Sequence, residues 1–221
     1  MYAGYDLKTN KYSKNPNNNT IKFHMKNGIF KNTKKSKNKY NYSNVISNIV
    51  INYVWHKSDG NFQKLLDKIF IEKAKVKNDV WFLRMKKNNV EFRYEVKDED
   101  GPIRYSFRAS RYDYLRIAKA MVDDWKNDTC VGKYLKEIYK RKISKNSKKT
   151  DPKSANGMSK SYAGFFHTNY KGINNSRSVM GMVGYGGQII LIDFDQSRII
   201  VINSIHTNYN WKKIAHVVIK N

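Results

Sequence analysis

The stretch VMGMVGYGGQIILIDFDQSRIIVINS, residues 179–204, decides the fold class. It holds two runs rich in β-branched residues, near 180–193 and 198–204, and the polar segment FDQS at 194–197 separates them. Apolar runs on either side of a short polar segment predict two antiparallel strands joined by a turn. The C-terminal part of the chain is therefore predicted to contain an antiparallel strand pair.

Five helices are predicted around this strand pair, because apolar residues repeat there every three or four positions. They are expected over 45–56, 61–77, 111–126, 131–143 and 210–219. Ser110 followed by Asp113 resembles a capping box at the start of the third helix. Asn61 and Asn210 can cap the second and the last.

Between the second and third helices, residues 80–107 alternate apolar and polar positions, which predicts strands. The segments 90–96 and 103–107 flank the turn sequence DEDGP, so we expect them to pair as a hairpin. Residues 142–161 are rich in lysine and serine and are predicted to form a long surface loop. Helices come first and an antiparallel pair with a closing helix follows, so the predicted fold class is α+β.

The charge of the chain is strongly positive, with 43 Lys+Arg against 18 Asp+Glu and a formal net charge of +25. Such an excess ordinarily indicates nucleic acid or another anionic partner. Lysine supplies most of it, whereas arginine, the better bidentate partner for phosphate and guanine, is scarce. Abundant lysine and asparagine with little proline is typical of an AT-rich coding sequence. We interpret much of the charge as coding bias and keep a basic module that binds nucleic acid or another polyanion as an alternative.

Composition excludes several classes of protein. No run approaches 18 apolar residues, so no membrane span is expected. The first residues lack the apolar region of a signal peptide. The single cysteine, Cys130, rules out an internal disulfide framework and a multi-thiolate metal site. The five histidines show no metal-ligand spacing, so they are interpreted as surface or hydrogen-bonded side chains, and no metal or other cofactor is expected.

A cluster of glycines at 181, 184, 186 and 187 suggests a phosphate-binding loop. A dinucleotide fingerprint fails here, because Ile189 occupies the place of the third glycine and the chain continues as a strand. No G-K-[ST] follows for a P-loop either. Glycines along a strand instead allow another backbone or a ligand to approach closely.

Three short motifs occur in a characteristic order. Tyr42-Ser43-Asn44 stands directly before the predicted helix 45–56. The segment S-x-x-D-Y-L-R-I-A covers 110–118, and G-Y-G-G-Q covers 184–188. In this order, with the aspartate turn and the terminal helix after them, the chain resembles the second half of the beta-lactamase-related serine hydrolases. That family includes penicillin-binding-protein-like esterases, class C beta-lactamases and 6-aminohexanoate-dimer hydrolases.

The resemblance implies a partial beta-lactamase-like fold. A helical lobe with the Y-x-N motif and a hairpin would cover residues 1–178. The last antiparallel strands and the closing helix of the α/β lobe would cover residues 179–221, and both parts would belong to one structural unit.

The resemblance also implies a mechanism, in which the serine of an S-x-x-K motif attacks an ester or amide carbonyl and forms an acyl-enzyme. Tyr42 would be the proton relay, and Asn44 would orient the substrate amide or the lysine. The segment Tyr185-Gly186-Gly187 would line the cleft, and the N–H of Gln188 would be the oxyanion donor. Tyr185 departs from the lysine or histidine of the family at this position. The implied substrate is a small ester or amide, with no cofactor.

The nucleophile motif has no good match in the sequence. Ser36-Lys37-Asn38-Lys39 fits S-x-x-K, but it lies just before Tyr42, in a lysine-rich loop rather than at a helix start. We therefore expect the nucleophile segment to lie outside these 221 residues. No serine of the chain is expected beside a lysine or tyrosine base, so the chain is expected to be inactive by itself. A non-catalytic member that binds a peptide or glycan in the cleft is a further alternative.

Overall fold

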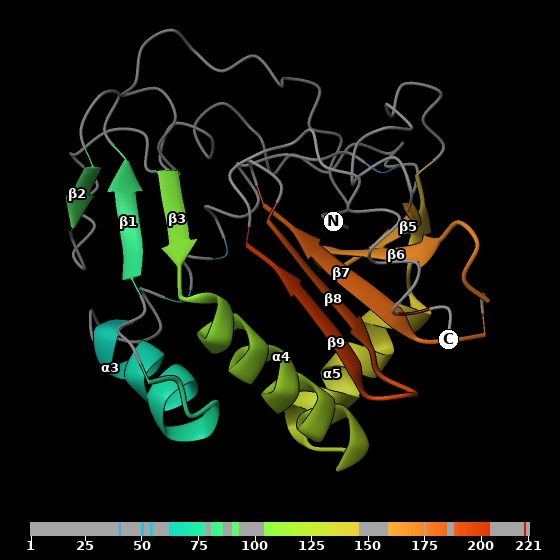
Figure 1. Cartoon of the computed structure of the whole chain (residues 1–221), viewed down its shortest axis with the longest axis horizontal. Helices are drawn as coiled ribbons and strands as arrows, with labels where there is room; N and C mark the ends of the chain where they lie inside the picture. The colour runs from blue at the N-terminus through green and yellow to red at the C-terminus, as the bar shows by residue number, and fades with distance from the viewer. Residues whose placement is uncertain are drawn as a thin grey trace, which may run out of the picture. The chain divides into compact units, whose positions relative to one another are not determined.

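The computed structural model divides the chain into two compact units (Figure 1). The first unit comprises residues 3–109, and the second comprises residues 110–221 with residues 1–2. The structure describes residues 40, 50, 54, 62–77, 81–85, 90–92, 104–145, 159–174, 176–184, 188–203 and 219. The expected boundary after residue 178 is corrected, because one continuous sheet extends across it.

The first unit contains a helical segment and a small sheet. Helix α3 covers Phe62–Leu66 and continues as the π-helix η2 over Asp67–Lys73. This confirms the second predicted helix, although Ile69, one of its apolar residues, is 43% exposed. Of the first predicted helix, only Val50 and Val54 lie within the described residues, and both are helical.

The sheet of the first unit corrects the predicted hairpin. Strand β1 covers Trp81–Met85, β2 covers Val90–Phe92 and β3 covers Arg104–Arg108. The order is β2-β1-β3, so β1 pairs with both neighbours and β2 does not pair with β3. Alternation along a sequence identifies a strand but carries no information about its partner. In the structure β3 pairs with β1 and not with β2.

Two helices open the second unit. Helix α4 covers Arg111–Lys126, and the Ser110 side chain caps it by accepting the N–H of Asp113 at 3.1 Å. The predicted capping pair is confirmed, since Ser110 Oγ also donates to Asp113 Oδ2 at 2.7 Å. Helix α5 covers Cys130–Lys140, capped by Thr129, and is shorter than predicted because strand β4 begins soon after it.

A six-stranded antiparallel sheet follows. Its strands are β4 Ile143–Ser144, β5 Ser159–Ala163, β6 Phe166–Tyr170, β7 Val179–Val183, β8 Ile189–Asp193 and β9 Arg198–Ile202. They pair in sequence order, as a meander. The turn at 194–197 is confirmed, but the single strand predicted over 180–193 is two strands separated by the glycine-rich segment. The predicted loop 142–161 is corrected at both ends, which form β4 and the start of β5.

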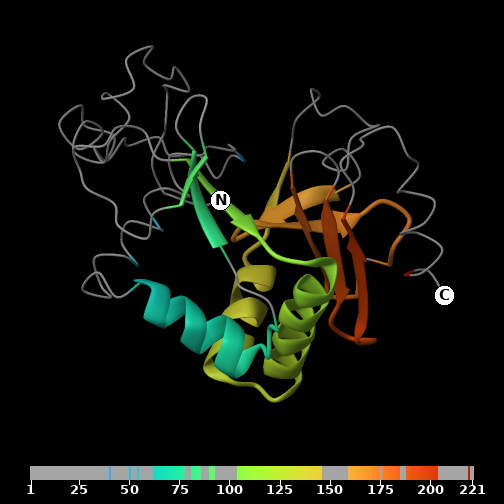
Figure 2. The same cartoon turned by 60° about the vertical axis from the view of Figure 1, so that its left-hand side comes forward.

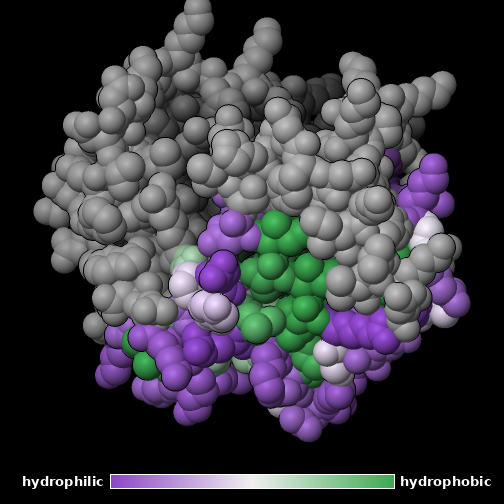
Figure 3. Space-filling model, in the orientation of Figure 1, coloured by the Kyte–Doolittle hydropathy of each residue, from purple (hydrophilic) through white to green (hydrophobic). Residues whose placement is uncertain are grey.

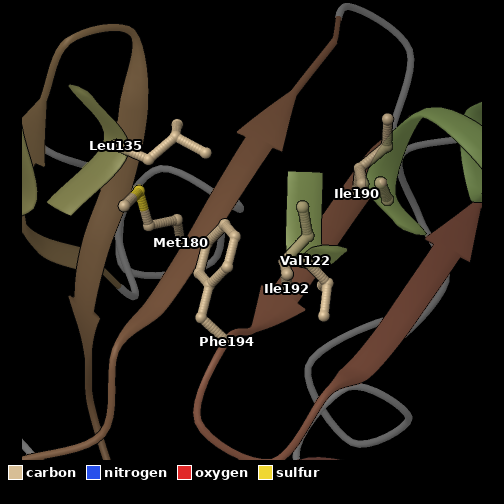
Figure 4. Packing of buried hydrophobic residues seen from close by; sticks show 7 residues of the cluster. Val122, Leu135, Met180, Ile190, Ile192 and Phe194 are labelled. Atoms are coloured by element: carbon tan, nitrogen blue, oxygen red, sulfur yellow. The ribbon is translucent and has the colours of Figure 1, made fainter. Parts of the chain in front are cut away.

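Each face of this sheet has its own apolar core. On one face, Met180, Ile192 and Phe194 pack against Val122 of α4 and Leu135 of α5 (Figure 4). Figures 1 and 2 show α4 and α5 lying against this face. The opposite face has a second buried cluster, which consists of Tyr170, Val179, Ile189, Leu191, Ile200 and Ile219. Helices together with an antiparallel sheet confirm the α+β class.

Of the predicted last helix, only Ile219 lies within the described residues; it is helical and fully buried. Ile219 belongs to the second cluster, on the face opposite α4 and α5. Near these strands, Figure 3 shows an apolar area over the region that β8 and β9 occupy in Figure 1. In β9, Ile199 and Val201, which pack against the cluster beneath α4 and α5, are half-buried.

Candidate functional site

The glycine-rich segment forms the connection between β7 and β8. The N–H of Gly184 donates to the carbonyl of Gln188 at 2.8 Å, directly beyond the last strand pair, Val183 with Ile189. A strand follows this connection instead of a helix, which confirms that the segment is not a dinucleotide-binding fingerprint. Gln188 is thereby held at the base of a hairpin loop.

The other predicted site residues lie outside the described residues. Tyr42 and Asn44 fall in the first unit, and Tyr185, Gly186 and Gly187 fall in the hairpin loop of the second. The structure describes Gln188 alone among the six. The convergence of Tyr42 with the glycine-rich loop therefore stays a prediction.

Gly181 of β7 has a clear structural role below this loop. A Cβ on Gly181 would lie 1.9 Å from the Tyr170 hydroxyl oxygen and 3.1 Å from Cδ1 of Leu191. Burial raises the pKa of Tyr170, so its phenol stays protonated. The Tyr170 hydroxyl has no hydrogen-bond partner among the described atoms. Only glycine leaves room for this ring against β7.

A polar cluster that the sequence did not indicate lies at the β4 side of the same sheet. It consists of Lys145, which follows β4, Ser159, which begins β5, and His167 in β6. Lys145 Nζ is hydrogen-bonded to Ser159 Oγ and lies 2.6 Å from Nδ1 of His167. Ser159 Oγ is 3.1 Å from the same nitrogen. The three side chains therefore form a closed triangle.

The backbone holds this triangle in place. The N–H of Lys145 donates to the carbonyl of Lys160 at 2.8 Å, which continues the β4–β5 ladder by one residue. On the other side, the ring of His167 packs edge-on against Tyr162, with the ring centroids 5.0 Å apart. Lys145, Ser159 and His167 are 6%, 4% and 5% exposed, so all three are buried.

Burial changes the ionisation of the two basic groups. Desolvation lowers the pKa of Lys145 to about 8, because burial penalises the ammonium form. Desolvation, followed by the charge of Lys145, lowers the pKa of His167 to about 3. His167 is therefore neutral at pH 7, and about a tenth of the Lys145 side chains are neutral at that pH, one unit below their pKa. A neutral amine beside a hydroxyl can accept its proton, which is the first requirement for an activated serine.

This cluster corrects the expectation that no serine of the chain lies beside a lysine base. The sequence predicts a surface loop at Lys145 and Ser159, because their neighbours are lysine, serine and asparagine. Their contact depends on the pairing of β4 with β5 across thirteen intervening positions, 146–158, and no local pattern encodes such a pairing.

The ion pair between Arg177 and Asp193 has a structural role. Arg177 donates through Nη2 to Oδ2 of Asp193, whose other oxygen accepts the N–H groups of Asp195 and Gln196, both at 3.1 Å. Asp193 is fully buried at the end of β8. These bonds fix the turn between β8 and β9, which explains why an aspartate precedes the turn.

Acid is expected to destabilise the second unit through His167. The unfolded side chain binds a proton below pH 6.5, whereas the folded one stays neutral down to about pH 3. Within this window the unfolded state holds more protons, so this group lowers the free energy of unfolding by about 1.4 kcal/mol per pH unit as the pH falls. Urea unfolding between pH 7 and pH 4 measures the slope, and His167→Gln should flatten it. Parallel slopes for the two proteins would contradict the assignment.

Within the described part of the chain, no group of three or more His, Cys, Asp or Glu side chains is arranged to hold a metal ion. The search for a membrane-spanning helix, made over the same residues, found none of sufficient length and apolarity. Comparison with known proteins gave no further lead, since no family model, no curated protein and no solved structure matches the chain.

Proposed function

We propose that the chain is part of a beta-lactamase-related serine hydrolase, which cleaves small esters or amides through an acyl-enzyme, with a partial beta-lactamase-like fold. In this proposal the nucleophile belongs to an S-x-x-K segment outside these 221 residues. Tyr42 relays the proton, Asn44 orients the substrate, and the loop at 185–187 lines the cleft. The N–H of Gln188 is the oxyanion donor.

One observation carries the proposal: the β7–β8 hairpin and the position of Gln188 within it. An oxyanion donor stabilises the transition state only if it is already oriented before the reaction. The bond from Gly184 to the Gln188 carbonyl fixes that residue at the end of β8, whose five residues are all buried. The motif G-Y-G-G-Q thus connects two paired strands, β7 and β8, as a cleft-lining loop requires.

One further observation supports the proposal. The capped helix α4 carries the segment S-x-x-D-Y-L-R-I-A in the form that the resemblance implies.

The alternative of a polyanion-binding module would need lysines aligned in one basic stripe. Three of the described lysines are engaged within the chain: Lys136 donates to Asp128 at 2.8 Å, Lys142 lies over the ring of Tyr139 at 4.0 Å, and Lys145 is buried.

The test uses the chain extended at its N-terminus by the encoded residues that precede Met1. We expect benzylpenicillin to form a covalent adduct on a serine of the added segment, detected by intact mass and located by peptide mapping. The 221-residue chain should form no penicilloyl adduct. An extended chain that carries S-x-x-K and still forms no adduct would move the protein to the non-catalytic, ligand-binding class.

In the extended chain, Tyr42→Phe is expected to slow acylation by about 100-fold or more, because a positioned proton relay contributes factors of this size. The rate is measured by quenched-flow mass spectrometry with benzylpenicillin. Tyr40→Phe is the matched control, since it removes the same hydroxyl two positions away and should leave the rate within about two-fold. Equal rates for the two variants would remove Tyr42 from the mechanism.

A further inference from the structure

The Lys145–Ser159–His167 triangle has the geometry of an activated serine, independently of the glycine-rich loop. Ser159 Oγ is hydrogen-bonded to Lys145 Nζ, the nearest nitrogen that can take its proton. Lys145 Nζ is also 2.6 Å from Nδ1 of His167, and in the tautomer that carries its proton on Nε2 this nitrogen accepts an N–H from the amine. This second bond orients the lysine, so that its lone pair can be directed at the serine hydroxyl.

We propose that Ser159 is an acylatable nucleophile with Lys145 as its general base, and that the site takes small activated acyl donors such as aryl acetates. His167 is a positioning residue, because it acts through Lys145. The proposal does not rest on the function proposed above, since neither Tyr42 nor the glycine-rich loop takes part.

The proposed reaction needs only the cluster, the acyl donor and water. Lys145, as the neutral amine, takes the proton of Ser159 while Oγ bonds to the carbonyl carbon of the ester. The tetrahedral intermediate collapses by breaking the bond to the aryl oxygen, and the ammonium of Lys145 returns its proton to that oxygen. The products are acyl-Ser159 and a free phenol. Water then attacks the acyl group with Lys145 again as base, which releases a carboxylic acid and restores the serine.

The position of the cluster sets the size of the donor. The three side chains are buried, so a bulky substrate cannot reach Ser159 without rearrangement. The cluster nevertheless lies at the margin of the sheet, beside β4, which is two residues long and pairs with β5 through two residue pairs. Short, sparsely paired edge strands open at low free-energy cost. A small acyl donor can therefore enter during local opening of β4.

The experiment treats the full 221-residue chain with p-nitrophenyl acetate at pH 8, followed by the release of p-nitrophenol and by peptide mapping. We expect a burst of p-nitrophenol and one acetyl group on Ser159. Hydroxylamine should remove this group, because it cleaves esters and leaves the amides of acetylated lysines intact. Acetyl groups confined to lysine amines would overturn the proposal.

Three variants assign the roles. Ser159→Ala should abolish the burst, and Lys145→Met should slow it by about 100-fold, the usual contribution of a general base. The matched control is Ser161→Ala, which removes another buried serine of β5, one that binds Asn169 instead of Lys145. It should leave the burst unchanged. Labelling of Ser159 at the same rate in Lys145→Met would overturn the role of the lysine.

The unmodified chain provides a test that does not depend on the folding of any variant. If neutral Lys145 is the base, the rate of Ser159 acetylation should rise with pH and level off above about pH 8, where the amine is neutral. A rate that climbs through pH 10 without levelling off would indicate attack by hydroxide or by ordinary surface groups. Penicillin adducts on an added segment would not bear on this result, because they map to a different serine.

Discussion

Replacing Arg177 by methionine is expected to lower the free energy of unfolding of the second unit by about 3–5 kcal/mol, the usual cost of breaking a buried ion pair from one side. Methionine keeps an apolar stem of similar length but removes the cation that binds Asp193. The Asp193 carboxylate is 0% exposed, so it would stay buried with its charge uncompensated by Arg177. Urea unfolding followed by far-UV circular dichroism measures the loss.

The control for this prediction is Lys119→Met, which breaks an ion pair of similar geometry on the surface. Lys119 and Asp123 are 68% and 50% exposed, and their atoms lie 2.6 Å apart. Solvent screens such a pair, so the expected loss is about 0.5 kcal/mol or less. Equal losses for the two variants would show that burial of Asp193 does not govern the strength of its pair.

Replacing Gly132 by alanine is expected to destabilise the second unit by about 3 kcal/mol, near the upper end of the range for overpacking. This loss of stability is opposite to the usual effect, because replacing glycine by alanine inside a helix ordinarily stabilises the helix by about 1 kcal/mol. A Cβ on Gly132 would lie 1.9 Å from the carbonyl oxygen of Asp124 and 2.6 Å from its carbonyl carbon. Those atoms belong to the backbone of α4, which a rotamer change cannot move.

The same carbonyl of Asp124 accepts the N–H of Thr129 at 3.2 Å, so displacing it would also weaken the cap of α5. Thermal unfolding measures the effect, and Lys133→Ala at the next, exposed position is the control, expected within about 0.5 kcal/mol of the parent. A more stable Gly132→Ala variant would mean that α4 and α5 separate without cost.

The elements that the sequence predicts correctly are those whose signals are local. The start of α4 follows from Ser110 and Asp113, because the capping bonds join residues three positions apart. The turn at 194–197 follows from a polar segment between two apolar runs. In both places one short segment contains all the information that its conformation needs.

Pairing and burial were not predictable in the same way. Strands β5 and β6 have the sequences SKSYA and FHTNY, whose polar residues do not indicate two interior strands of a sheet. The sequence predicts one long strand through the glycines after β7, whereas these glycines mark a reversal of the chain. The Lys145–Ser159 contact is the clearest case, because it arises only when β4 and β5 pair.

The meander order of the six-stranded sheet has a consequence for how the second unit forms. Every strand from β4 to β9 pairs with the strand that immediately precedes or follows it in the chain. Such pairs close short loops, and a topology of low contact order folds quickly. During synthesis each new hairpin can dock onto strands that have already left the ribosome, with α4 and α5 available beforehand as a template. The Lys145–Ser159 contact belongs to the first hairpin of this meander, so it can form before the glycine-rich loop has left the ribosome.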